Sequence, residues 1–308
     1  MGHIVVLTPN PAIDVTYRVS SQKVGETHRV LEPSKRAGGK GINVARILKM
    51  LGHDAVCVLP LGGTAGTWIR SELKEAGISL AIAEIAEEVR TTVAIIDSSH
   101  HPTLFSERGP ELNSAEIQQL TGVLRDELHK APCLVISGSL PPGVSPADLA
   151  DWVTMAHRAG VKVIVDASGA ALVAAATAGA DIAKANEIEL RDATSTIRLD
   201  DGIAALRMLG ARTVVISRGS QGLEAMSDDE TYVVSAIPEL HGNPTGAGDA
   251  ATAGLASALV EGLPLLEGLR RAAALGAAAV LSPVAGEMQH ATYLGFLARY
   301  HTEDGTFR

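Results

Sequence analysis

The sequence predicts an α/β fold in which helices cover both faces of a doubly wound, mostly parallel β-sheet. Short β-branched runs alternate with segments that are apolar at positions i, i+3 and i+4, several of which end in glycine. Because strand–helix–strand units join parallel strands, this alternation over 308 residues favours one large sheet. Only 3% of the residues are aromatic although 46% are hydrophobic, so aliphatic side chains must fill the core.

The strands of this sheet are expected from their β-branched content, and the helices from their apolar spacing. In chain order, the strands are 3–8, 54–59, 133–137, 161–166, 181–185 and 213–217, and the helices identified between strands are 41–52, 65–77, 113–130 and 145–160. Cys57 and Cys133 fall within two of these strands. We therefore expect two buried thiols rather than a disulfide or a metal pair.

Two segments break the alternation. Residues 14–36 alternate apolar and polar side chains without a helical pattern, and residues 89–108 have the pattern of a hairpin. They are expected to pair into a small antiparallel sheet beside the main one; two unrelated surface hairpins are the alternative. Neither a linker nor a repeat divides the sequence, so we expect a single domain, 1–308, that carries this sheet.

Charge and hydropathy exclude several kinds of partner. The net charge is −9 and the basic residues are dispersed, which argues against a nucleic acid or an anionic membrane surface. No apolar run has the length of a membrane span, and the N-terminus enters a strand pattern without a basic segment. A cytoplasmic location is expected.

A glycine-rich turn before an alanine-rich helical run surrounds one carboxylate. Gly246, Ala247 and Gly248 can expose successive N–H groups at the positive end of that helix, which favours an anion site with Asp249 beside it. One alternative is that Asp249 is only a first-turn helix residue. Another is a dinucleotide fingerprint ending at Ala251. It is disfavoured because it comes late in the chain and would place Asp249 beside a pyrophosphate.

A second polar group lies near the N-terminus. Gly38, Gly39 and Gly41 open a helix from whose first turn Asn43 projects, and Asp14 follows the first strand. Flexible backbone beside an amide and a carboxylate suits recognition of sugar hydroxyls. A simple strand-to-helix turn with Asn43 as cap, and an Asx turn at Asp14, are the alternatives.

Together these motifs resemble the phosphofructokinase B (ribokinase-like) family of carbohydrate kinases. The run Gly38–Ala45, with Gly52 and Gly62 after it, is similar to the first family signature, and Asn243–Asp249, with Ala253 and Gly254, to the second. Four further segments, TPNPAID, SGSLPPG, NEIEL and SRGSQG, fall where the family has similar ones. The resemblance covers nearly the whole chain and implies a ribokinase-like fold, ATP and Mg²⁺ as cofactors, and a β-sheet lid formed by 14–36 and 89–108 that also makes a possible homodimer contact.

The resemblance also implies roles for individual residues. Asp249 would be the catalytic base, and the N–H groups from Gly246 through Ala247 and Gly248 to Asp249 would form the anion hole. Sugar contacts would come from Asp14, Gly38, Gly39, Asn43 and Ser139. The ATP cleft would be lined by Lys184, Asn186, Ser217, Gly219, Gly222 and Gly248. Glu189 would complete the family's N-x-x-E element, which organises Mg²⁺ indirectly. Asp249 need not have a raised pKa, because in-line transfer asks the base chiefly for position and a helix N-terminus keeps a carboxylate ionised.

Within the family, the opening LTPNPAIDVTY and the GGKGINVAR run resemble the hexose-phosphate branch. Fructose 1-phosphate is the first expectation for the substrate, followed by tagatose 6-phosphate and fructose 6-phosphate. Arg90 and Arg29 would bind the substrate's phosphate, with solvated surface charges as the alternative. Leu104 and Ser106 replace a cation and an amide that 1-phosphofructokinases often have. An unphosphorylated sugar substrate is therefore a further alternative. A regulator that kept the fold and lost catalysis is a separate alternative, disfavoured because Asp249 and the glycines beside it are present.

Overall fold

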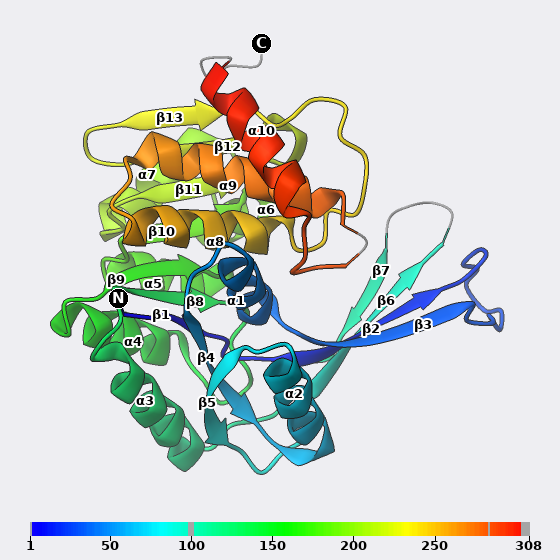
Figure 1. The fold of residues 1–308 in the computed structure, drawn as a ribbon. Helices are drawn as coiled ribbons and strands as arrows, with labels where there is room; N and C mark the ends of the chain where they lie inside the picture. The colour runs from blue at the N-terminus through cyan, green and yellow to red at the C-terminus, as the bar shows by residue number, and fades with distance from the viewer. Residues whose placement is uncertain (1, 98–101, 283, 303–308) are drawn as a thin grey trace.

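The computed structural model describes residues 2–97, 102–282 and 284–302 and contains two β-sheets (Figure 1). The larger has nine strands in the order β13-β12-β11-β10-β9-β8-β1-β4-β5. In chain order they are β1 (Ile4–Leu7), β4 (Ala55–Leu61), β5 (Ser79–Glu84), β8 (Cys133–Ser137), β9 (Lys162–Asp166), β10 (Ile182–Asn186), β11 (Val214–Ser217), β12 (Leu223–Met226) and β13 (Thr231–Val234). All neighbouring pairs are parallel except β11–β12 and β12–β13.

Ten helices are described: α1 (Lys40–Met50), α2 (Gly63–Glu75), α3 (Ser114–Leu128), α4 (Pro146–Arg158), α5 (Gly169–Thr177), α6 (Glu187–Thr194), α7 (Leu199–Leu209), α8 (Ala247–Val260), α9 (Leu265–Val280) and α10 (His290–Thr302). Alternate residues of each parallel strand face opposite layers. In β1, Ile4 and Val6 join the core with α1, α2 and α8–α10, whereas Val5 and Leu7 join the core with α3–α5. Helices cover both faces, which confirms the predicted fold class.

The prediction missed three strands of the main sheet. β5 is an edge strand, and β12 and β13 form an antiparallel pair at the other edge. β5 and β13 are edge strands with partly exposed side chains, so their apolar signal is weaker than that of the buried central strands. Cys57 and Cys133 are both buried and free.

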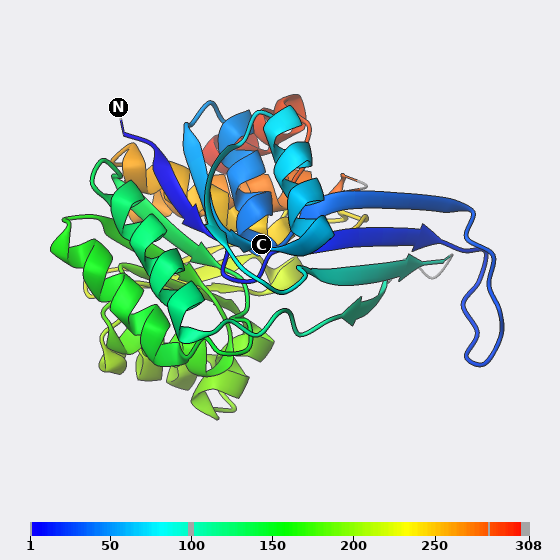
Figure 2. The same cartoon turned by 90° about the horizontal axis from the view of Figure 1, so that it is seen from below.

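The second sheet has four strands in the order β3-β2-β6-β7, and we call it the small sheet. It consists of β2 (Ala12–Arg18), β3 (Glu32–Gly38), β6 (Arg90–Ile96) and β7 (Thr103–Ser106). It extends away from the main sheet, as Figure 2 shows from below. The expected antiparallel arrangement is wrong for the central pair, because β2 and β6 are parallel. Each is the outgoing strand of its own hairpin, and the two hairpins lie side by side.

The topology brings the predicted site residues together at one edge of the main sheet. Asp166, Asn186 and Ser217 are the last residues of three parallel strands, β9, β10 and β11. In open α/β sheets, ligands bind outside the carboxyl ends of the strands. The small sheet leaves the main sheet at this same edge, since β2 begins five residues after β1 ends.

Candidate active site

The glycine-rich turn before α8 has the geometry of an anion site; we call Gly246–Asp249 the anion loop. Gly246 is the N-cap, with a left-handed φ of 85°, and a Cβ there would come within 2.9 Å of the Ala285 Cβ. The N–H groups of Gly248 and Asp249 lie in the first helical turn, where no intrahelical acceptor exists. The Ala247 N–H donates to the Pro244 carbonyl at 3.2 Å, so it is engaged in this structure.

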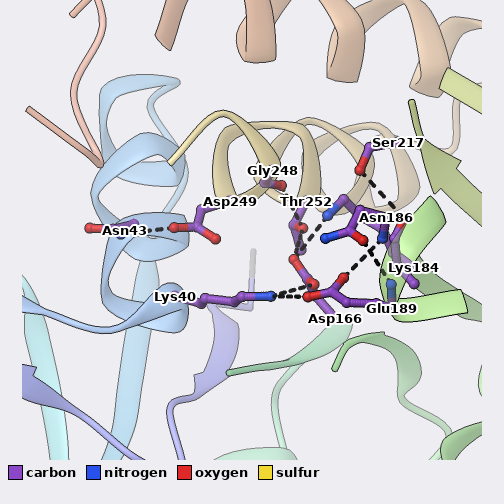
Figure 3. Close-up of polar contacts among 11 residues, drawn as sticks. Lys40, Asn43, Asp166, Lys184, Asn186, Glu189, Ser217, Gly248, Asp249 and Thr252 are labelled. Carbon is purple, nitrogen blue, oxygen red and sulfur yellow. Dashed lines mark hydrogen bonds and ion pairs between the residues drawn. The ribbon is translucent and has the colours of Figure 1, made fainter. Parts of the chain in front are cut away.

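Asp249 does not cap its own helix. No side chain caps α8, and the Asp249 carboxylate instead accepts a 2.8 Å hydrogen bond from the Asn43 Nδ2 of α1 (Figure 3). Asp148 occupies the matching position of α4, and its Oδ2 does accept from the cap residue, from the Ser145 N–H at 2.7 Å. The contact with Asn43 joins the two glycine-rich segments, which are 206 residues apart in the sequence.

The pKa of Asp249 is raised, which the sequence did not require. Burial raises the pKa of this carboxyl to about 6, and the negative charge of Asp166 adds to the effect. Lys40 and the hydrogen bond from Asn43 act in the opposite direction. These opposing interactions therefore only partly offset the desolvation of a residue that is 6% exposed.

Five polar side chains behind Asp249 form a group that we call the charge cluster: Lys40, Asp166, Lys184, Glu189 and Thr252. The Asp166 Oδ2 lies 3.0 Å from the Lys184 Nζ and accepts from the Thr252 hydroxyl at 2.7 Å (Figure 3). Although burial opposes ionisation, these neighbours and Lys40 hold the pKa of Asp166 well below its usual range. The carboxylate is thus charged and fully paired.

Lys40 bridges the two ends of the charge cluster. Its ammonium lies 3.4 Å from the Asp166 carboxylate and 3.2 Å from that of Glu189. The charge of Asp166, with those of Glu189 and Asp249, raises the pKa of Lys40 against the effect of burial. Lys40 also lies between Gly39 and Gly41 in the sequence. The glycine-rich segment before α1 therefore contributes a cation to the charge cluster.

Asn186 and Glu189 form the capping box of α6. The Asn186 Oδ1 accepts from the Glu189 N–H at 2.8 Å, and the Glu189 carboxylate accepts from the Asn186 N–H at 2.9 Å. No cluster of three metal-ligating side chains occurs in the described part of the chain. Mg²⁺ commonly uses one or two carboxylates and takes its other ligands from phosphates and water, so Glu189 fits an ion carried by ATP.

The residues predicted for the ATP cleft lie along the same edge. Lys184 points toward the anion loop, since a Cβ on Gly248 would lie 3.5 Å from its Nζ. The backbone at Gly219 is left-handed, and a Cβ there would meet nothing within 4 Å. At Gly222 a Cβ would lie 2.0 Å from the Val234 carbonyl. Gly222 is therefore explained by packing against β13, whereas Gly219 borders open space.

Asp14 and the two glycines lie together where the small sheet joins α1. Asp14 lies partly buried on β2, and a Cβ on Gly38 would come within 1.9 Å of its carboxylate. Gly39 has a φ of 110°, and its N–H donates to Asp14. Burial raises the pKa of Asp14 to about 6, against the opposing effect of Arg90. A second buried carboxylate thus faces the site from the small sheet.

Arg90 is held at the base of the small sheet by neutral acceptors. Its Nε and Nη2 donate to the Asn10 carbonyl at 3.3 and 3.1 Å, and its Nη1 donates to the Ser106 hydroxyl at 2.9 Å. The Asn10 side chain donates to the Ser139 hydroxyl at 3.2 Å. Arg90 and Ser139 line one pocket of about 400 Å³.

Arg29 does not join this group. It is exposed in the connection between β2 and β3, at the far end of the small sheet (Figure 1). Leu104 is 54% exposed on β7. Two arginines were predicted to bind the substrate's phosphate. Within this chain, only Arg90 lies beside the other residues predicted to contact the sugar.

Arg36 connects the small sheet to a loop that packs on the anion loop. Its guanidinium donates to the Ala285 carbonyl at 3.1 Å and pairs with Glu287 at 2.7 Å. Ala285 packs against Gly246, and a Cβ on Gly286 would come within 2.7 Å of the Asn43 Oδ1. The small sheet is therefore tied to the backbone that supports Asn43 and Gly246.

Sequence reasoning missed Asp166, Asn10 and the roles of Lys40 and Thr252. Asp166 ends the run VKVIVD, so a carboxylate at a strand's carboxyl end was the available signal. Nothing in the sequence indicated that Lys40 would reach Asp166, 126 residues away.

Comparisons with known proteins agree with this geometry. The pattern of the pfkB family carbohydrate kinases matches residues 7–291. The structure of phosphofructokinase-2 from Escherichia coli in complex with potassium has 30% identity and a TM-score of 0.91, over 98% of this chain and 100% of that one. The same enzyme in complex with fructose 6-phosphate has 30% identity and a TM-score of 0.87, over 97% and 99%.

A possible 1-phosphofructokinase from Thermotoga maritima has 23% identity and a TM-score of 0.86, over 96% of this chain and 97% of that one. At this identity the likeness supports the fold alone. The match over most of the sequence, with both glycine-rich segments meeting at Asp249, shows that this chain belongs to the pfkB family of carbohydrate kinases.

Proposed function

We propose that this carbohydrate kinase transfers the γ-phosphoryl group of ATP to a hexose phosphate, with Asp249 as the base. The observation that carries the proposal is the contact between Asp249 and Asn43, because it places a carboxylate between a hydroxyl-recognising segment and an anion site. A general base must lie within hydrogen-bond reach of the proton that it takes. Asp249 would do so for a hydroxyl bound by Asn43, whose Nδ2 donates to its carboxylate.

The transfer would proceed in line, without a covalent enzyme intermediate. The acceptor hydroxyl gives its proton to Asp249 as it attacks the γ-phosphorus, and ADP leaves on the opposite side. Charge on the transferred group would be stabilised by the N–H groups of Gly248 and Asp249 and by Lys40 and Lys184. When bound, Mg²⁺ neutralises the triphosphate, and Glu189 would help to hold it.

The small sheet would act as a lid over the sugar. Its base carries Asp14 and Arg90, so closure would bring these groups onto the substrate and exclude water, which otherwise competes for the phosphoryl group. Val30, Leu31, Leu104 and Phe105 are exposed apolar residues of this sheet and its connection. They support a homodimer contact through the lid, and light scattering of the purified protein would measure its mass.

Two hexose phosphates are favoured by specific observations. The LTPNPAIDVTY and GGKGINVAR runs, which resemble the hexose-phosphate branch, support fructose 1-phosphate as the first expectation from the sequence. The 30% identity to an enzyme crystallised with fructose 6-phosphate supports that sugar equally. Tagatose 6-phosphate follows as the third candidate.

Because these substrates and ATP are cytoplasmic metabolites, a cytoplasmic location is part of the proposal. Separately, none of the described helices is long and apolar enough to span a membrane.

The test is ADP release with Mg²⁺-ATP and a panel of the three sugar phosphates and their unphosphorylated parents, compared as kcat/KM. The proposal expects turnover with at least one sugar phosphate and a preference for it over its parent sugar. Silence across the panel, with sugar-phosphate binding intact by calorimetry, would instead support a non-catalytic regulator.

A further inference from the structure

We propose that Arg108 is a second phosphate-binding cation of the sugar pocket and that, with Arg90, it selects a hexose that already carries a phosphate. This inference rests on the proposed function and assigns the residue that sets its substrate class. Arg108 follows β7 and lines the same pocket of about 400 Å³ as Arg90, Ser106 and Ser139. Leu104, where a cation was expected, does not line that pocket.

A buried amide builds this pocket. Asn10 is 3% exposed, and its Nδ2 donates to the Arg108 carbonyl at 3.0 Å and to the Ser139 hydroxyl at 3.2 Å. Its backbone carbonyl accepts from Arg90. One fixed residue therefore sets the positions of Arg90, of the Arg108 backbone and of Ser139. The left-handed Gly109, with a φ of 98°, then turns the chain away from the pocket wall.

Neither arginine forms an ion pair within the described residues, although the charges of Asp14 and Glu107 act on Arg90. All hydrogen-bond acceptors of Arg90 are neutral, and the Arg108 guanidinium forms no ion pair within the described residues. Glu107 also lines the pocket, but its carboxylate accepts a 2.7 Å hydrogen bond from the Thr91 N–H. Two unpaired guanidinium groups in a chain of net charge −9 mark a site for an anion.

The chemistry of the ligand follows from these groups. Guanidinium groups bind phosphate oxygens through paired, charge-assisted hydrogen bonds, which a neutral sugar hydroxyl cannot match. Ser106 and Ser139 add hydroxyl groups of the kind that complete a phosphate shell. The pocket therefore fits the phosphate that the substrate brings.

The test compares Arg108→Ala and Arg108→Lys with the wild type, using the best sugar phosphate of the panel and its unphosphorylated parent. Arg108→Ala should raise KM for the sugar phosphate about ten- to a hundredfold, as expected for losing a charged hydrogen bond. The kcat and the KM for ATP should change less than about threefold. Arg108→Lys should recover part of the loss, and kcat/KM for the parent sugar should not change.

The matched control is Arg158→Ala, which removes an equally exposed arginine at the end of α4. Because α4 runs back from the carboxyl end of β8, Arg158 lies at the opposite edge of the sheet. It should leave every constant unchanged. Equal KM values for the sugar phosphate in wild type and Arg108→Ala would overturn the role of Arg108, and a higher kcat/KM for the parent sugar in the wild type would overturn both proposals.

Binding of inorganic phosphate tests the role of Arg108 separately from the proposed kinase reaction. By calorimetry, the wild type should bind phosphate at least about tenfold more tightly than Arg108→Ala, whether or not the panel shows turnover. A silent panel with this difference present would reject the proposed reaction and retain the anion site. Turnover on the panel, with identical phosphate binding by the two proteins, would retain the reaction and reject Arg108.

Discussion

Asp249 and Asp14 are two carboxylates at one site, and burial raises the pKa of each to about 6, yet their surroundings differ. Asp249 lies on α8 beside a buried charge cluster in which every carboxylate has a partner. Asp14 lies on the small sheet, where it is surrounded by arginines and glycine backbone. The residues proposed for phosphoryl transfer are therefore held by the core of the protein, and we call them the transfer side. The residues proposed to contact the sugar, the sugar side, are held by a sheet that is largely exposed.

The strongest challenge to this comparison is Asp249→Asn, which removes the proposed base and leaves the shape of the side chain nearly unchanged. We expect kcat to fall about 10²- to 10⁴-fold, the range for losing a general base, while ATP still binds. The matched control is Asp148→Asn, since Asp148 has the same position in α4 but caps its helix. It should change stability and leave kcat alone. Near-normal turnover by Asp249→Asn would remove this residue from the mechanism.

A second test concerns how the transfer side is held together. Asp166 and Lys184 are 1% and 3% exposed, so Asp166→Asn leaves a buried ammonium without its closest counter-charge. Breaking a buried pair costs about 3–5 kcal/mol, and we expect that loss in the free energy of unfolding measured with urea. The control is Glu32→Gln on the small sheet, whose pair with Arg18 is exposed and worth at most about 1 kcal/mol. Equal losses of unfolding free energy in the two variants would show that the buried pair stabilises the protein no more than the exposed pair does.

The sequence could predict the features that follow from local patterns, but not those that depend on contacts between distant residues. The fold class, the positions of the central strands and the Asp249 segment follow from local patterns: β-branched runs, helical spacing and a glycine-rich turn. Lys40 contacts Asp166 across 126 positions, and Asn10 contacts Arg108 across 98, so no local pattern contains these contacts. The raised pKa of Asp249 was missed for the same reason, because burial and the charge of Asp166 are products of packing.

The pH dependence of kcat/KM sharpens the comparison of the two carboxylates. Asp249 must be ionised to accept a proton, so activity should be level above about pH 7 and fall about tenfold per unit as the pH drops below about 6. If the sugar also requires ionised Asp14, the fall should be steeper, and Asp14→Asn should restore the single slope. An acid limb near pH 4, the range of an ordinary aspartate, would show that burial does not govern Asp249.

The smallest expected effect is at the Arg36 contact, which joins the small sheet to the loop that packs on the anion loop. Arg36→Ala removes the tie from the small sheet to Ala285 and Glu287, and with it a support for Asn43 and Gly246. Because Glu287 is 49% exposed, the pair is worth about 0.5–1 kcal/mol, which corresponds to a two- to fivefold lower kcat.

The position of the Arg36 contact predicts which constants change. KM for ATP should not change, and ADP release without sugar should rise relative to sugar phosphorylation, because the small sheet is released from the anion loop. Arg36→Ala combined with Glu287→Ala should be no worse than Arg36→Ala alone, if Glu287 acts only through its pair with Arg36. Arg18→Ala, which breaks the exposed pair farther out on the same sheet, is the control. If it gave the same rise in uncoupled ADP release, loosening of the sheet as a whole would explain the effect, and the Arg36 contact would have no separate role.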